Sequence, residues 1–173
     1  EDGLNGELKL LFEGFGNKSS VVDNTDNKLL VLTDIEAPNY RLIEVDLNNT
    51  AKATWKDIIP ATDNLLEGVS TGGGKLFASY LEKATNRIYQ MNYDGSAKVA
   101  IELPGLGSAG GFSGKKEDSQ LFYSFTSFIY PSIIFNYDIE SGTSAPFFET
   151  ELKFSPEDYV EKQVEYKSKD GET

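Results

Sequence analysis

The feature that most constrains the fold is a short motif that occurs three times at a constant spacing. Its copies begin at residues 41, 87 and 133, so they lie 46 residues apart, and they cover Arg41–Leu47, Arg87–Tyr93 and Ile133–Ile139. All three are rich in the β-branched, aromatic and other apolar residues that occur in strands. A period of this length is typical of propeller blades, each of which is one four-stranded antiparallel sheet. The repeat therefore predicts an all-β fold.

Turn-forming clusters divide the rest of the chain into three cycles around these motifs. We predict a partial β-propeller over residues 1–154, with a remnant strand in 1–16 and four-stranded antiparallel blades over about 19–60, 65–104 and 109–152. Residues 155–173 are predicted to be a linker, with a short turn or helix at Pro156 and a strand over 159–166.

The number of blades is too small for a closed ring, because propellers typically have about four to eight. An open stack leaves apolar sheet faces bare at its ends, which favours self-association. We therefore expect the sequence to be part of a larger protein.

Equivalent positions of the three motifs carry large apolar side chains. They are Ile43, Tyr89 and Phe135; Val45, Met91 and Tyr137; and Leu47, Tyr93 and Ile139. We interpret them as packing between blades, where each fully buried side chain contributes about 1.5–3 kcal/mol. The alternative is an aromatic box that binds a ligand.

The charge and composition exclude several classes of function. The net charge of −12 disfavours binding to a phosphate backbone, so we expect no nucleic-acid partner. The chain has no Cys and no His, which excludes thiolate–imidazole zinc sites and every nucleophile activated by histidine. No apolar run reaches the roughly 18 residues of a membrane helix, so we expect no membrane partner. We expect no cofactor and no metal.

Three motifs look like functional sites but each lacks an essential part. Asp23–Asn27 alternates acids and amides like a calcium loop, yet the Gly and Glu of an EF-hand are missing, which favours a hairpin turn. Gly72–Lys75 is followed by Leu and not by Ser or Thr, so a β-turn is preferred to a phosphate-binding loop. Ser113 lies in a false nucleophile elbow with misplaced glycines, and we predict that it belongs to an innermost strand.

Several stretches together resemble the β-propeller of the prolyl oligopeptidase (prolyl endopeptidase) family, over nearly the whole chain. They are Ala37–Ile43, Phe112–Gly114, Phe122–Phe128 and Tyr166–Gly171. In that family a seven-bladed propeller caps an α/β-hydrolase domain, and a serine peptidase site lies between them. The resemblance implies that this chain is the C-terminal half of the propeller and that the hydrolase domain would follow it.

The resemblance carries over no catalytic, cofactor-binding or metal-binding residue, because the family's triad belongs to the hydrolase domain. It implies a gate that admits short proline-containing peptides, in a chain that is not an enzyme by itself. Its partner would be the hydrolase domain of the same protein, in the cytoplasm or the periplasm. The alternatives are a free-standing binding or scaffold module assembled from two or more chains, and a glycosidase that uses two of the 28 acids.

Overall fold

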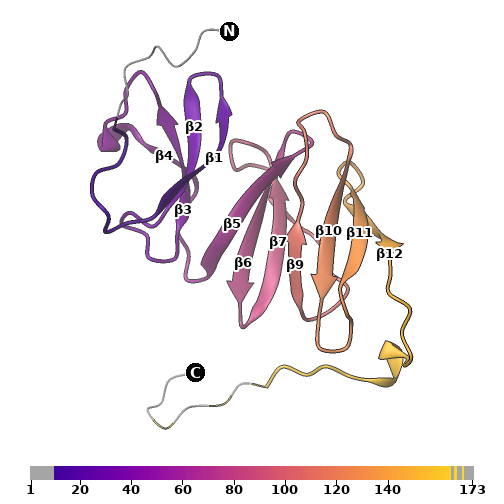
Figure 1. The fold of residues 1–173 in the computed structure, drawn as a ribbon. Coiled ribbons are helices and arrows are strands. Elements are labelled where there is room, and N and C mark those ends of the chain that lie inside the picture. Colours follow the sequence, from indigo (N-terminus) through magenta and orange to yellow (C-terminus); the bar gives the residue numbers. More distant parts are fainter. Residues whose placement is uncertain (1–9, 165, 167–168, 170–173) are drawn as a thin grey trace.

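The computed structural model describes residues 10–164, 166 and 169 and consists of three separate four-stranded sheets (Figure 1). Blade 1 contains β1 (Ser19–Thr25), β2 (Lys28–Thr33), β3 (Arg41–Asp46) and β4 (Lys56–Ile59). Blade 2 contains β5 (Leu65–Gly72), β6 (Lys75–Glu82), β7 (Thr85–Met91) and β8 (Val99–Ala100). Blade 3 contains β9 (Ser108–Gly111), β10 (Gln120–Thr126), β11 (Ile133–Asp138) and β12 (Thr143–Phe148). Two short 3₁₀ helices complete the described elements, η1 (Lys52–Thr54) and η2 (Pro156–Asp158).

Every sheet is an antiparallel meander in which the strands follow one another in chain order. Tight turns make this possible: Gly73 and Gly74 between β5 and β6, and Lys83 and Ala84 between β6 and β7, all have positive φ. Two consecutive positive φ values give the turn whose twist matches that of the flanking strands. The all-β prediction of about three four-stranded blades is confirmed.

The interface between blades 1 and 2 is a hydrophobic core built from alternate residues of facing strands. Blade 1 contributes Leu30 and Leu42, and blade 2 contributes Leu76, Tyr80 and Met91, all less than 5% exposed. The side chains of a strand alternate between the two faces of its sheet. Residues 76, 78 and 80 of β6 therefore point to blade 1, and Phe77 points to blade 3.

The interface between blades 2 and 3 is more aromatic. Phe112 stacks on Tyr123 and on Phe77, with ring centroids 4.4 and 5.4 Å apart, and Tyr137 meets Phe77 edge-on at 6.0 Å. Such stacked and edge-to-face pairs add roughly 0.5–1.5 kcal/mol each to the burial of their area. Ile88, in the strand β7, is buried in the same core.

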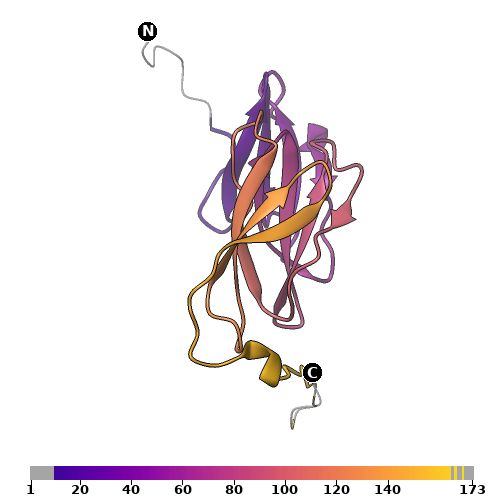
Figure 2. The ribbon, with the colours of Figure 1, turned by 90° about the vertical axis from the view of Figure 1, so that its right-hand side faces the viewer.

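The two outermost sheet faces differ in their cover. On blade 1, Val31, Ile43 and Val45 are at most 1% exposed, with Phe12 and Trp55 packed over them. Figure 2 looks onto the outer face of blade 3, which no other described element covers. That face presents apolar side chains that are 36–65% exposed, namely Phe122, Ile134, Phe147 and Phe148.

The structure corrects several predicted strands. Residues 159–164 and 166 form no strand, because no described strand lies beside them to supply hydrogen bonds, whereas the predicted helical turn at Pro156 is the helix η2. The predicted remnant strand lies partly outside the described residues, and its residues 10–16 are coil. The last strand of each blade pairs on one side only, and the shortest is β8, which pairs with β7 over two residues. No described helix is long and apolar enough to span a membrane.

Candidate functional site

The first strands of the three blades, β1, β5 and β9, are here called the inner strands. Each is the free edge of its sheet, and the three follow one another across the molecule (Figure 1). Small side chains occur on all three inner strands: the exposed Ser19 and Ser20 on β1, the half-buried Ser70 on β5, and the exposed Gly110 and Gly111 on β9. The inner strands are thus partly open to solvent along their free edges.

Two hollows lie between neighbouring inner strands. The hollow between β1 and β5 has a volume of about 490 Å³ and is lined by Lys18, Ser19, Ser20, Leu32, Tyr40, Leu65 and Glu67. The hollow between β5 and β9 has a volume of about 280 Å³ and contains Glu67, Ser70 and Gly110. Glu67 contributes to both and is the exposed carboxylate at the bulge in β5.

Asn86 connects Glu67 to blade 3. Its side-chain amide donates to Glu67 Oε2 at 2.5 Å, and its Oδ1 accepts from the backbone N–H of Ala109 at 2.9 Å. Ser70 Oγ donates to the carbonyls of Gly111 and Phe112 at 3.2 and 3.0 Å. Side chains of blade 2 thus form hydrogen bonds with backbone groups at the free edge of β9. Such bonds occupy groups that could otherwise pair with a strand of another molecule.

The turn at Asp23–Asn27 is a hairpin, as its sequence favours, although only Asp26 and Asn27 lie outside the paired strands. Asp23 is engaged by protein groups, since its Oδ2 accepts from Tyr93 Oη at 2.5 Å. Within the described part of the chain, no group of three His, Cys, Asp or Glu residues could hold a metal ion. The geometry therefore supports the turn and gives no argument for a calcium loop.

The glycines before Lys75 form a close contact between blades. A Cβ at Gly73 would overlap Ile139 and the carbonyl of Asp118, and a Cβ at Gly72 would lie 2.8 Å from Leu121. Lys75 Nζ donates to Asn92 Oδ1 at 2.6 Å. The glycines are thus explained by the approach of blade 3, and the predicted β-turn is observed.

Ser113 does not belong to an innermost strand, which corrects the prediction. The strand β9 ends two residues earlier, at Gly111, because Gly111 and Phe112 have positive φ values of 124° and 51°. This turn sends the Phe112 ring into the core between blades 2 and 3. The exposed Ser113 Oγ donates to the carbonyl of Gly111 at 3.3 Å.

Eight of the nine apolar repeat positions lie in a hydrophobic core, whereas Leu47 is half-buried and belongs to none of the three cores of the described residues. Tyr89, Met91 and Tyr93 contact blade 1, and Phe135, Tyr137 and Ile139 contact blade 2. Ile43 and Val45 of the first copy lie on the outer face of blade 1, under Phe12 and Trp55. Inter-blade packing thus accounts for the second and third copies, whereas Ile43 and Val45 of the first copy pack against residues outside the blade strands.

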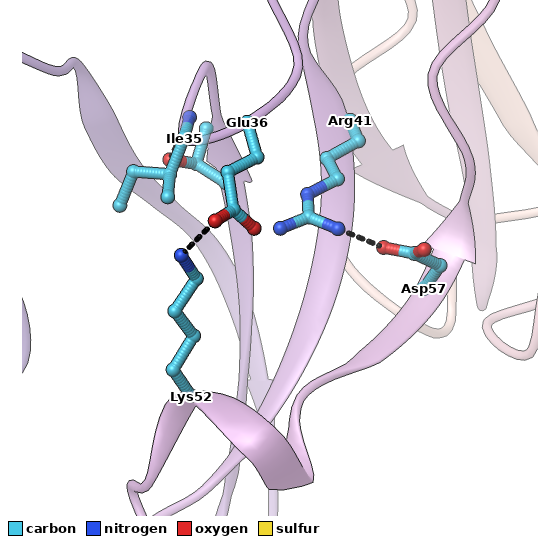
Figure 3. Close-up of polar contacts among 6 residues, drawn as sticks. Ile35, Glu36, Arg41, Lys52 and Asp57 are labelled. Carbon is cyan, nitrogen blue, oxygen red and sulfur yellow. Dashed lines mark hydrogen bonds and ion pairs between the residues drawn. The ribbon is translucent and has the colours of Figure 1, made fainter.

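Charged groups gather beside the outer face of blade 1 (Figure 3). Lys52 Nζ lies 2.5 Å from Glu36 Oε1, and Arg41 Nη1 lies 3.2 Å from Asp57 Oδ1. The hydrogen bond from Lys52 lowers the pKa of the Glu36 carboxyl below its usual value. These side chains join the β2–β3 loop, η1, β3 and β4 at the edge of the sheet, and the Lys52–Glu36 pair is exposed to solvent, where ion pairs contribute little to stability.

Sequence reasoning missed Lys18, Glu67, Asn86 and Tyr93 as polar contacts of the inner edge. Asn86 is the second residue of β7 and directly precedes the second copy of the repeat, which begins at Arg87. One signal was available: a run of small residues, Ser108–Gly111, at the start of a blade indicates a free inner edge that needs partners from elsewhere.

Three consecutive four-stranded meanders, packed face to face with small residues along their inner edges, define a portion of a β-propeller. The family model described as "Prolyl oligopeptidase, N-terminal beta-propeller domain" matches residues 2–150. The chain therefore belongs to the prolyl oligopeptidase family and supplies part of its propeller domain.

Curated relatives agree with this assignment. The chain is 41% identical over 161 residues to a prolyl endopeptidase of Elizabethkingia meningoseptica, covering 93% of this chain and 23% of the relative. It is 29% identical over 178 residues to a prolyl endopeptidase of Dictyostelium discoideum, covering 96% and 23%. The chain thus spans about a quarter of the length of the relatives that it matches.

Solved structures share the fold. A structure from an analysis of two prolyl endopeptidases superposes with a TM-score of 0.85 at 35% identity, covering 94% of this chain and 24% of that one. Prolyl oligopeptidase B from Galerina marginata superposes with a TM-score of 0.82 at 23% identity, covering 93% and 24%. The three blades described here are thus the portion of a larger propeller protein that these structures also contain.

Proposed function

We propose that this chain is the C-terminal half of the propeller that gates a serine peptidase specific for proline, and that it is catalytically inert alone. The observation that carries the proposal is the match to the family's propeller domain over residues 2–150, at about a quarter of the relatives' length. The chain contains no histidine, so it has no base of the kind that activates a serine nucleophile.

The gate acts by size. The inner strands border the path of a peptide, and their small side chains and the carboxylate of Glu67 form its wall. A rigid wall of packed sheets admits an extended peptide and excludes a folded protein, while it shields the reacting groups of the adjacent hydrolase domain from bulk water. In this proposal the chain limits substrate size and takes no part in bond cleavage.

The uncovered outer face of blade 3 supports the proposal that this chain is one part of a larger propeller. Phe122 and Phe147 meet edge-on at 4.8 Å, yet they are 47% and 65% exposed. Asn136 Oδ1, on the same strand as Ile134, is buried without a hydrogen-bond partner among the described residues. A further blade of the full-length protein would bury these rings and supply a donor.

The test compares two proteins on a chromogenic peptide that contains proline. The full-length protein is expected to cleave it after proline, and the 173-residue chain is expected to give no turnover. Turnover by the purified chain that is lost on mutating a residue within it would contradict the proposal.

A second candidate is a scaffold module that assembles its ring from two or more chains. The observation in its favour is the same bare face, because a second copy would also bury it. Solution mass distinguishes the two: a defined oligomer of the 173-residue chain that binds a specific ligand favours the scaffold, whereas a full-length peptidase with one ring per chain favours the gate.

A further inference from the structure

One polar cluster joins all three blades. Asp23 comes from β1 of blade 1, Tyr93 follows β7 of blade 2, and Lys116 lies in the β9–β10 loop of blade 3. Tyr93 Oη donates to Asp23 Oδ2 at 2.5 Å, and Lys116 Nζ lies 4.0 Å from the same oxygen. Lys116 Nζ also donates to the carbonyl of Asn24 at 3.2 Å and lies 5.6 Å from the centroid of the Tyr93 ring.

The cluster lies at one end of the inner strands. We call this end the upper rim, because the β1–β2 turn, the β5–β6 turn and the β9–β10 loop are at the top of Figure 1. Backbone bonds run along the same rim, from Gly73 N–H to the Lys115 carbonyl at 2.8 Å and from Gly114 N–H to the Thr71 carbonyl at 3.0 Å. Blades 2 and 3 are thus tied at the rim where Lys116 reaches across to blade 1.

The cluster differs in kind from the hydrophobic cores between blades. Each core joins two neighbouring sheets, and apolar contact is not directional, so packed sheets can slide or rotate slightly against each other. Hydrogen bonds weaken steeply when their distance and angle change, and those to charged groups are the stronger ones. The Asp23 side chain is 20% exposed, so water competes little for its bond to Tyr93. The cluster therefore fixes a distance that the cores alone leave adjustable.

We propose that Asp23, Tyr93 and Lys116 form a three-blade latch that fixes the spacing of the inner strands at the upper rim. Release of the latch lets blade 1 and the β9–β10 loop move apart and widens the channel at that end. The latch is a property of the fold. Its consequence for the size of peptide admitted rests on the proposed function as a gate.

The first test measures the latch without any activity. Tyr93→Phe removes one hydroxyl and keeps the ring, and Tyr89→Phe is the matched control, since the hydroxyl of Tyr89 bonds to no described residue and Tyr89 lies in the same strand region. In the full-length protein we expect Tyr93→Phe to speed amide hydrogen exchange in residues 23–27 and 112–118 by about tenfold, from the loss of a hydrogen bond to a charged group. Exchange as slow in Tyr93→Phe as in Tyr89→Phe would overturn the latch.

Lys116→Met separates the two halves of the latch and is safe for folding, because the Lys116 side chain is 58% exposed. It keeps the bond between Tyr93 and Asp23 but removes the bond from Lys116 to the carbonyl of Asn24, so exchange should rise more in residues 112–118 than in the β1–β2 turn. Equal increases in both segments, or none in either, would contradict the separate roles assigned to Tyr93 and Lys116.

The activity arm uses the full-length protein with two proline-containing peptides, one of about eight residues and one of about thirty. Tyr93→Phe should raise kcat/KM for the long peptide relative to the short one, and Tyr89→Phe should leave the ratio unchanged. If exchange rises but the ratio does not, the latch holds and its role in size selection is wrong. If the unmodified protein cleaves neither peptide, the proposed function fails while the exchange result still decides the latch.

Discussion

The outer faces of blades 1 and 3 occupy equivalent positions at the two ends of one stack, yet only the first is closed. On blade 1, Ile43 is 0% exposed because Phe12 and Trp55 pack over its sheet, whereas Ile134 on blade 3 is 36% exposed. The two sheets have the same strand order and the same repeated motif. The two faces are opposite faces of the repeated unit, because Ile43 is a repeat position, whereas in blade 3 the equivalent Phe135 faces blade 2 and Ile134 lies on the other side of the sheet. Both faces of a blade thus carry apolar side chains, and residues outside the strands determine whether an end face is covered.

The largest expected effect comes from the same substitution on the two faces. Ile43→Ala should lower the free energy of unfolding by about 2–4 kcal/mol, because it leaves a cavity in a covered face. Ile134→Ala should lower it by less than about 1 kcal/mol, because its side chain is already partly hydrated. Urea denaturation of the two variants checks this, and equal losses would mean that the two ends are equally covered.

Removing the cover should have an intermediate effect. Phe12 meets Trp55 edge-on at a centroid distance of 5.4 Å, and Phe12→Ala should cost about 1–2 kcal/mol of unfolding free energy from lost burial and the ring contact. Phe15, three residues later, is fully exposed and provides the matched control. Thermal unfolding should separate Phe12→Ala from Phe15→Ala; identical midpoints would remove Phe12 from the cover.

Alkaline pH should lower the stability of the contacts between blades, where Tyr93 and Tyr137 lie. Burial, with the hydrogen bond to Asp23, raises the pKa of Tyr93 to about 12, and burial with the nearby charge of Asp138 raises the pKa of Tyr137 to about 12. The folded state then holds protons that the unfolded state releases above its pKa of about 10. Stability from these groups is therefore fully present below pH 10 and is lost as the pH rises toward 12.

The measurement is the urea midpoint at pH 8, 10 and 11. Tyr93→Phe and Tyr137→Phe should each reduce the fall between pH 10 and 11, since phenylalanine has no proton to lose. A slope as steep in both variants as in the unmodified protein would assign the alkaline loss to other groups.

The smallest expected effect on folding comes from the bare face itself. Replacing Phe122 and Phe147 by Ser should change the unfolding free energy of the chain by less than about 1 kcal/mol, because both rings are about half exposed or more. The same double variant should reduce self-association of the 173-residue chain, measured by light scattering. Undiminished association would place the contact on another surface.

Much of the fold was predictable because its information is local and periodic. The 46-residue spacing predicts the three blades. The alternation of apolar residues within β3, β7 and β11 predicts that Ile43, Tyr89 and Phe135 lie on the same face of their respective sheets. The prediction failed where pairing partners decide the outcome: residues 159–164 carry strand-forming side chains but have no described strand beside them. The ends of strands also depend on single backbone angles, such as the φ of Phe112, that composition does not encode.

The candidate site was less predictable, because its contacts are distant in sequence and involve common residue types. Asp23 and Tyr93 are 70 residues apart, and Glu67 and Asn86 are 19 apart, with no motif that connects either pair. The absence of histidine excludes only a nucleophile that is activated by histidine within this chain. The compartment, cytoplasm or periplasm, stays a prediction.

The strictly sequential order of strands has a consequence for how the chain is made. Each blade closes on itself within about 40 residues, so most of its contacts are short in sequence separation, and such segments fold fast and early. The blades can therefore fold one after another during synthesis, beginning with the N-terminal blade. A sheet that has been made before the sheet that packs on it exposes its apolar face to water, so the interval between consecutive blades is the stage at which the nascent chain is most prone to aggregate.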